Sequence, residues 1–218
     1  MVTPASQMAL KGLRDLSTLE WYVIPFLALV FYVYTNEMKK AKTTGNWDAI
    51  FAGLTVFGMD FINETWNGWV FHLTQRSALW TAPGETALRT MVGWNIEIMF
   101  MFAISGIIYY NTLSEDEEVK ILGLPERWFW AVGYAAFCVF VECLLNKGGH
   151  LVWEYEWWNR SFKGVWLIFF FGYFHFYVAA IIVLSLKSIK AKVATVSSIY
   201  AVAIAGNVVG LGILGWVY

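Results

Sequence analysis

Six long apolar segments separated by short turns dominate this 218-residue chain and leave few folds open to it. They lie at about 21–36, 49–73, 88–110, 128–151, 164–186 and 194–217, and each approaches the roughly 20 residues that a helix needs to cross a bilayer core. Only 14% of the residues are charged, which is well below the level of soluble domains. The sequence therefore predicts an all-α, polytopic membrane bundle of about six transmembrane helices.

The first residues have a different pattern from the rest. Leucine recurs at every third position from Leu10 to Leu19, with charged residues between. This pattern favours a short amphipathic helix lying along the membrane surface. We expect an interfacial segment at 1–20, followed by a single transmembrane domain at 21–218, because the turns are too short for a separate soluble domain.

Basic residues in the turns predict the orientation. Lysines gather in Lys39–Lys42 after the first segment and in Lys187–Lys192 after the fifth, which favours the cytoplasmic side for both turns. Lys147, Arg160 and Lys163 oppose this orientation in the turn after the fourth segment. The balance predicts a multi-pass protein with both termini on the non-cytoplasmic side.

Several polar residues lie at one predicted depth, where lipid would disfavour them. Counting 1.5 Å per residue from the predicted helix ends places five of them about 14–17 Å down, near the middle of the core: Glu64, Glu97, Glu142, His175 and Asn207. A shallower tier consists of Asn67, Asn95 and Asn146, while His72 and His150 lie near the rim. This layer predicts a polar cavity inside the bundle that opens toward the outer face.

Two of the segments share a spacing of glutamate and histidine. Glu64 precedes His72 by eight residues, and Glu142 precedes His150 by the same number. A parallel duplication of helical hairpins would arrange the two sets around a central cavity. Coincidence in a biased composition is the alternative, and both explanations stay open.

Buried carboxyl groups in such a cavity suit acid/base chemistry. A carboxyl group in an apolar environment generally stays protonated near neutral pH and donates a proton, while a second one accepts. In this interpretation Glu64 and Glu142 form the acid/base pair, and Glu97 and His175 tune or relay protons. No cofactor is required.

Aromatic and amide side chains predict a hydrophobic substrate. Five of the 13 tryptophans, including Trp166, flank the polar positions and can line an apolar pocket. Four of them are expected to bind the substrate: Trp66, Trp69, Trp94 and Trp153. Four asparagines would orient the substrate: Asn67, Asn95, Asn146 and Asn207. Trp80 and Trp158 are expected in the interfacial belt. The net charge of −1 and the lack of a basic patch exclude a nucleic-acid partner, so the bilayer and a hydrophobic small molecule are the expected partners.

Two other functions and one structural role remain open. In a second interpretation, Glu64, Glu97, Glu142 and His175 ligate iron, manganese or zinc, with His72 and His150 at the rim, although the Glu-x-x-His pairs of di-iron bundles do not occur. Carboxylates at mid-depth also suit a small proton- or cation-coupled transporter. Alternatively, these groups only hydrogen-bond the helices together.

A resemblance to a known family supports the acid/base interpretation. The basic turn Lys39–Lys42 leads into a helix that carries Asn63 and Glu64 near Trp66. This arrangement resembles the small integral-membrane terpene cyclases of fungal meroterpenoid pathways, over residues 30–70 only. The resemblance implies a cyclisation, isomerisation or hydration of an isoprenoid, with Glu64 as the proton donor. The chain departs from the family pattern because its tryptophan follows the glutamate and Asn207 stands where a second acid is wanted.

Overall fold

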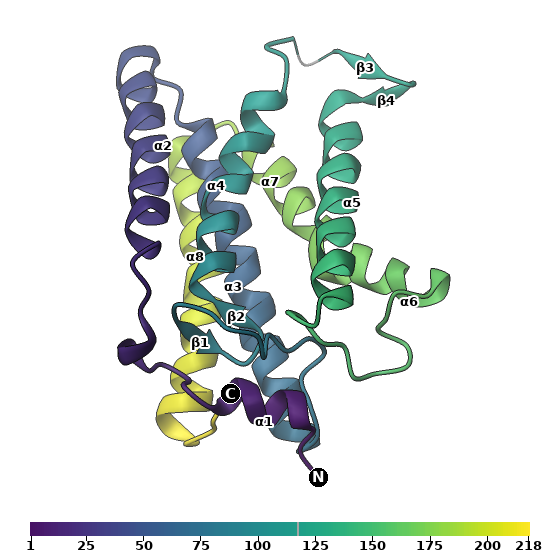
Figure 1. Ribbon diagram of the computed structural model, residues 1–218. Helices are drawn as coiled ribbons and strands as arrows, with labels where there is room; N and C mark the ends of the chain where they lie inside the picture. Colours follow the sequence, from purple (N-terminus) through teal and green to yellow (C-terminus); the bar gives the residue numbers. More distant parts are fainter. Residues whose placement is uncertain (117) are drawn as a thin grey trace.

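The computed structural model describes residues 1–116 and 118–218, and this part of the chain is mainly helical. The elements in chain order are α1 (Pro4–Leu10), η1 (Leu16–Thr18), α2 (Val23–Thr44), α3 (Asp48–Thr74), β1 (Arg89–Met91), β2 (Trp94–Asn95), α4 (Ile96–Thr112), β3 (Lys120–Ile121), β4 (Leu124–Pro125), α5 (Glu126–Lys147), α6 (Phe162–Leu167), the π-helix η2 (Ile168–Phe174), α7 (His175–Ser185), α8 (Ile189–Asn207) and the π-helix η3 (Val208–Ile213). Figure 1 shows the long helices running alternately up and down the bundle.

Three of the helical stretches are long and apolar enough to cross a membrane. These are Glu126–Lys147, Phe162–Ser185 and Ile189–Ile213, while the shorter apolar helix is Ile96–Thr112. The exposed side chains on these helices are themselves mostly apolar, as lipid contact requires. The helical membrane class predicted from the sequence is therefore confirmed.

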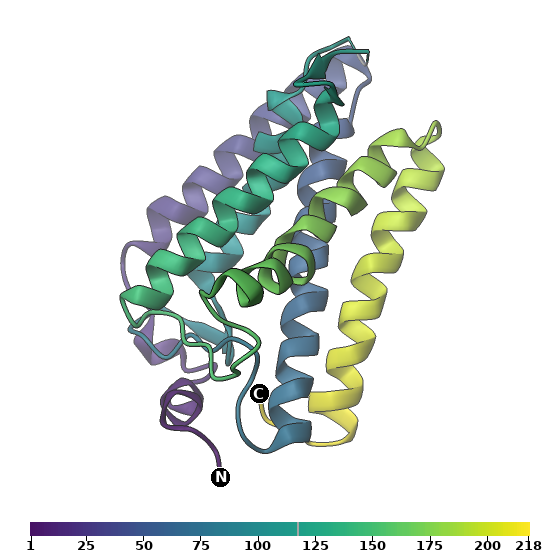
Figure 2. The same ribbon diagram turned by 90° about the vertical axis from the view of Figure 1, so that its right-hand side faces the viewer.

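Helix α3 forms the centre of the bundle. It contacts α4, α7 and α8 over much of its length, and Figure 2 shows it between α8 and the other helices. Its backbone comes close to that of α4, where a Cβ atom on Gly106 would lie 2.2 Å from the carbonyl oxygen of Ala52. Small residues let two backbones come this close, as in many membrane bundles.

The third apolar segment is helical over less of its length than predicted. Residues 89–95 form the β1–β2 hairpin, and α4 begins only at Ile96. Asn95 caps this helix, because its Oδ1 accepts a hydrogen bond from the backbone N–H of Ile98 at 2.9 Å. Gly93 lies in the turn of the hairpin, packed so closely that a Cβ atom there would meet Asn67 Nδ2 at 2.5 Å.

The N-terminal segment is also less helical than the leucine pattern predicts. Helix α1 ends at Leu10, and Gly12 and Arg14 then turn the chain with positive φ angles of 69° and 59°. Leu16 and Leu19 are exposed, so the leucines do not form one stripe on one helix. Instead, the buried side chain of Ala9 packs α1 against the end of the bundle.

A buried arginine anchors this N-terminal segment. The Arg89 guanidinium donates hydrogen bonds to the backbone carbonyls of Ala82 at 2.8 Å and Lys11 at 3.1 Å, and also to those of Ala9 and Gly84. Arg14 Nη2 donates to the carbonyl of Tyr218 at 2.7 Å. Both chain ends consequently lie at the same end of the bundle (Figure 1).

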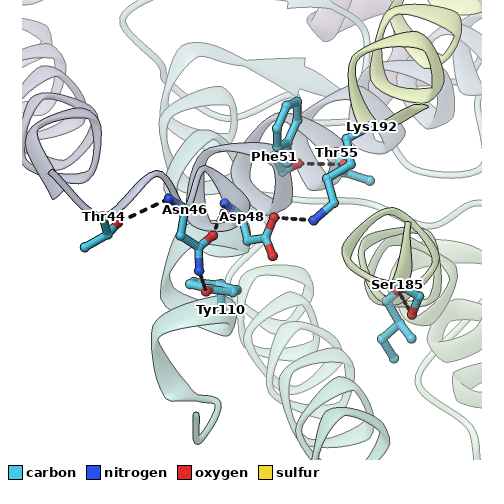
Figure 3. A network of polar contacts seen from close by, with 9 residues as sticks. Thr44, Asn46, Asp48, Phe51, Thr55, Tyr110, Ser185 and Lys192 are labelled. Carbon is cyan, nitrogen blue, oxygen red and sulfur yellow. Dashed lines mark hydrogen bonds and ion pairs between the residues drawn. The ribbon is translucent and has the colours of Figure 1, made fainter. Parts of the chain in front are cut away.

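Polar contacts join the helices at the opposite end. Lys192 at the start of α8 forms an ion pair with Asp48 at the start of α3 (Figure 3). Asn46 Oδ1 accepts from the backbone N–H of Asp48 at 2.9 Å, and Asn46 Nδ2 donates to the hydroxyl of Tyr110 at 2.8 Å. The lysines of the orientation prediction are mostly helical and not in turns, because α2 continues through Lys42 and α8 begins at Ile189. Both lysine-rich stretches share one end of the molecule, away from the termini (Figure 1).

Candidate functional site

A cavity of about 390 Å³ lies among α3, α4, α5 and the η2–α7 stretch. Its walls are mostly apolar and include Phe102, Phe176 and Tyr177. Four carboxyl side chains contribute to its lining: Asp60, Glu64, Glu97 and Glu142. The structure thus brings three of the sequence-predicted site residues, Glu64, Glu97 and Glu142, into one cavity, together with Asp60.

Glu64 is held by a tryptophan from the segment that follows its own helix. The Trp80 indole N–H donates to Glu64 Oε1 at 2.7 Å, and only 3% of Glu64 is exposed. Asn67 lies near the carboxyl group, but its Nδ2 donates to the carbonyl of Trp80 at 2.8 Å, and its Oδ1 accepts from the backbone of Leu79. Among the described residues, Glu64 Oε2 has no hydrogen-bond partner.

Glu142 is held in an equivalent way. The Trp153 indole N–H donates to Glu142 Oε1 at 3.0 Å, and Asn146 Nδ2 donates to the carbonyl of Leu151 at 3.0 Å. In both hairpins, then, a buried glutamate accepts from a tryptophan of the segment after its helix, and an asparagine one turn further along the helix fixes that segment.

The two segments that carry these tryptophans are joined to each other. Thr81 and Val152 form an antiparallel β-bridge, with N to O distances of 3.0 and 2.7 Å. The bridge lies immediately after Trp80 and immediately before Trp153. The backbone bridge consequently joins the two segments whose tryptophans donate to Glu64 and Glu142.

The histidines of the predicted repeat have different environments. His72 stacks on Trp216 with ring centroids 4.4 Å apart, whereas His150 is exposed beside Gly84. Neither lines the cavity among the described residues. The similarity between the two hairpins is therefore found in their Glu, Asn and Trp contacts.

Asp60 is a third buried carboxyl group at the cavity and was absent from the predicted site. Its Oδ2 accepts from the Trp94 indole N–H at 2.8 Å, and 4% of the residue is exposed. The sequence does place Asp60 one turn from Glu64, on the same face of the helix, and this spacing could have identified it as a site residue.

Glu97 lines the cavity while joining the start of α4 to two other segments. Its carboxylate accepts from the Tyr22 hydroxyl at 2.6 Å, the Thr86 hydroxyl at 2.5 Å and the backbone N–H of Ala87 at 3.0 Å. Both oxygens therefore have strong donors. Glu97 therefore holds α4 to these two segments. Its role in tuning the acid/base pair or relaying protons stays a prediction.

His175 lies outside the cavity lining, where it stabilises a π-helix. Its Nδ1 pairs with the carbonyl of Phe170 at 3.1 Å, and its Nε2 pairs with Asn63 Oδ1 at 3.2 Å. Asn63 Nδ2 in turn donates to two carbonyls of η2. The π-helix directs Tyr173 into the cavity, within hydrogen-bonding reach of Glu142.

The other predicted substrate contacts lie elsewhere. Asn95 caps α4, and Asn207 donates to the Thr65 hydroxyl at 2.6 Å. Trp66 is 53% exposed, and Trp69 packs edge-on against Trp216. Within the described part of the chain, none of the eight predicted substrate-binding residues appears in the cavity lining: Asn67, Asn95, Asn146, Asn207, Trp66, Trp69, Trp94 and Trp153. Trp94 and Trp153 contribute indirectly, by donating to carboxyl groups that do line it.

Two tryptophans expected in the interfacial belt are part of the site instead. Trp80 and Trp158 are 7% and 3% exposed, stack with ring centroids 5.7 Å apart and line the cavity. They are buried because the connections after α3 and α5 fold back against the helices. The belt prediction is wrong for both residues.

The cavity opens sideways, between α4 and α5. Three of its lining residues are well exposed: Met101 at 62% and Ile108 at 46% on α4, and Phe137 at 59% on α5. The buried carboxyl groups and the bridged segments lie at the inner end. The expected opening toward the outer face is replaced by a mouth on the flank of the bundle.

The described residues hold no group of three or more His, Cys, Asp or Glu side chains placed to bind a metal ion. His175, which the metal hypothesis needs beside the three glutamates, pairs with Asn63 instead.

Comparison with known proteins places the chain among membrane proteins. A protein of Archaeoglobus fulgidus, described only as uncharacterized, is 42% identical over 217 residues, covering 100% of both chains. No solved structure matches the chain. The sequence model of an uncharacterized membrane protein family matches residues 3–212, so the chain belongs to that family.

Proposed function

We propose that this protein is an integral membrane enzyme that performs acid/base chemistry on an isoprenoid or other lipid-like substrate. The observation that carries the proposal is the unpartnered, buried Oε2 of Glu64 in an apolar cavity that also contains Glu142. A fixed carboxyl group with one free oxygen beside a second carboxyl group suits a proton donor and acceptor. The sideways mouth suits a substrate that arrives from the bilayer.

The proposed reaction is an isomerisation, cyclisation or hydration. Protonated Glu64 transfers its proton to an alkene or epoxide of the substrate, and ionised Glu142 accepts a proton from a neighbouring carbon or from an incoming water. Proton exchange between the two carboxyl groups restores the starting state, so no oxidant or reductant is needed. Aromatic walls such as Phe102 and Tyr177 would stabilise a cationic intermediate.

Deuterium labelling tests this proposal. Purified protein in lipid nanodiscs is incubated in D₂O with isoprenoid hydrocarbons, alcohols and epoxides, and the lipids are analysed by mass spectrometry. Wild-type protein should yield a product with carbon-bound deuterium from an alkene, or a cyclised or ring-opened alcohol from an epoxide, whose oxygen receives the proton, and Glu64→Gln should yield neither. Glu37→Gln is the matched control, because Glu37 is a buried acid outside this cavity. The absence of both kinds of product with all three substrate classes would contradict the proposal.

We further propose that α2, α3 and α4 span the membrane beside the three longer apolar helices, giving six spans. The exposed side chains of α2 support this, because Ile24, Phe31 and Tyr32 are 63–72% exposed and lipid would cover them. The basic end of α2 and the basic stretch from Lys187 to Lys192 would be cytoplasmic, and both termini non-cytoplasmic.

Cysteine labelling in intact cells tests the orientation. In a background without Cys138 and Cys143, Lys39→Cys and Lys187→Cys should resist a membrane-impermeant maleimide until the cells are opened. Arg76→Cys, in the turn after α3 beside the N-terminal segment, should react at once. All three positions are exposed, so access through the membrane decides the result. The reverse pattern would invert the orientation.

A further inference from the structure

Resting on the proposed function, we infer that the cavity accepts a single-chain lipid with an uncharged or cationic headgroup and excludes the same chain carrying a phosphate. The charges around the cavity and the position of its mouth decide which substrates reach the carboxyl groups.

The charge of the lining has one sign. Asp60, Glu64, Glu97 and Glu142 all line the cavity, whereas none of the lining residues that the structure describes is a lysine, arginine or histidine. Proteins bind phosphate groups with arginine, lysine or clustered backbone N–H donors. A phosphate here would meet Glu97 and the ionised carboxylate of Glu142 at low dielectric, where like charges repel strongly.

The buried Arg89, which is nearby, does not supply the positive charge that the lining lacks. Arg89 is close enough to Glu97 to interact with it electrostatically. Its guanidinium, however, donates to four backbone carbonyls, and Arg89 is not among the residues that line the cavity. Its N–H groups are thereby bonded to backbone carbonyls, so Arg89 does not offer a phosphate site.

The arrangement of polar and apolar lining orients the lipid. The carboxyl groups of Glu64 and Glu142 lie at the inner end with Trp80 and Trp158, and the mouth is formed by Met101 and Phe137. A headgroup would therefore lie at the inner end while its chain extends toward the bilayer. An amine headgroup would gain attraction both from carboxylates and from the aromatic walls.

Two native cysteines on α5 provide a built-in assay. Cys138 lines the cavity, whereas Cys143 does not and packs against the core from outside it. A bound lipid should therefore slow alkylation of Cys138 by membrane-permeant N-ethylmaleimide and leave Cys143 unchanged. The probes are farnesol, farnesylamine and farnesyl phosphate, which share one chain and differ only at the headgroup.

We expect protection of Cys138 by farnesylamine and farnesol, with the amine effective at the lower concentration. Farnesyl phosphate should require at least about a 100-fold higher concentration, since juxtaposed like charges commonly cost this much affinity. A Glu64→Gln, Glu142→Gln double variant should narrow the difference between farnesol and the phosphate, and Glu37→Gln should not. The shift in melting temperature with each probe gives a second measure if Cys138 reacts slowly or the double variant unfolds.

Equal protection by the phosphate and the alcohol would overturn the inference while leaving the acid/base proposal standing. If none of the three probes protects Cys138 or shifts the melting temperature, the lipid-binding cavity and the proposed function both fail.

Discussion

Gly106→Ala should destabilise the folded protein by about 1–3 kcal/mol or more, the range observed when a packed contact is overfilled. The added methyl group would lie 2.2 Å from the carbonyl oxygen of Ala52 and 2.8 Å from the Cα of Gly53. Both neighbours are backbone atoms of α3, which cannot rotate away as a side chain can. Separating α3 from α4 would also disturb the cavity wall, because α4 contributes Phe102 and Ser105 to it.

Gly133→Ala is the matched control for this change. Gly133 is an exposed residue of α5, and the nearest atom to an added Cβ is a Trp130 side-chain carbon at 3.8 Å. Alanine should stabilise that helix slightly, by up to about 1 kcal/mol in helix propensity. Thermal unfolding in detergent measures both variants, and equal melting temperatures would show that α3 and α4 are not in such close contact.

Replacing either glutamate of the proposed acid/base pair should lower turnover by roughly 10²–10⁴, the usual contribution of a general acid or base. Glu64→Gln keeps the side-chain volume and the hydrogen bond from Trp80, but the amide cannot supply the acidic proton. Glu142→Gln likewise removes a proton acceptor while Trp153 still has an oxygen to bond. Substrate affinity, measured by protection of Cys138, should change much less than turnover.

The same two variants distinguish the other roles. If these residues ligate a metal ion, bound metal should fall together with activity, because an amide is a poorer ligand than a carboxylate for a hard cation. If they only join helices, glutamine should preserve both activity and melting temperature. Full activity in both variants would remove Glu64 and Glu142 from the mechanism.

The positions of the long helices were predictable because hydropathy reports them directly. The start of α4 was not, since Val92 and Trp94 count as apolar although they belong to a β-hairpin turned by Gly93. The leucines at 10–19 have a helical spacing, yet Gly12 and Arg14 turn the chain within it. Regular spacing describes a face only where the backbone continues as one helix.

Glu64 and Glu142 line one cavity, as counting helical depth from the sequence predicts. Glu97 lines it as well, but from the first turn of α4, because the residues along which its depth was counted form a hairpin and not a helix. Their partners could not be found in that way, because Trp80 and Trp153 come from connections that fold back against the bundle. A buried carboxyl group needs donors, and an indole N–H is a donor with no acceptor capacity. Pairing unsatisfied carboxylates with loop tryptophans would have identified Trp80, which hydropathy assigned to the membrane surface.

The bridge between Thr81 and Val152 also imposes an order of assembly. Helix α3 and the Trp80 segment are synthesised early, but the strand partner of that segment follows α5, far along the chain. Contacts between such distant parts of a sequence form late, after the local helices and their neighbours. A nascent chain that ends before Val152 therefore has the helix that carries Glu64 but lacks the bridge to the Trp80 segment. The cavity can perform its chemistry only after both hairpins are in the membrane.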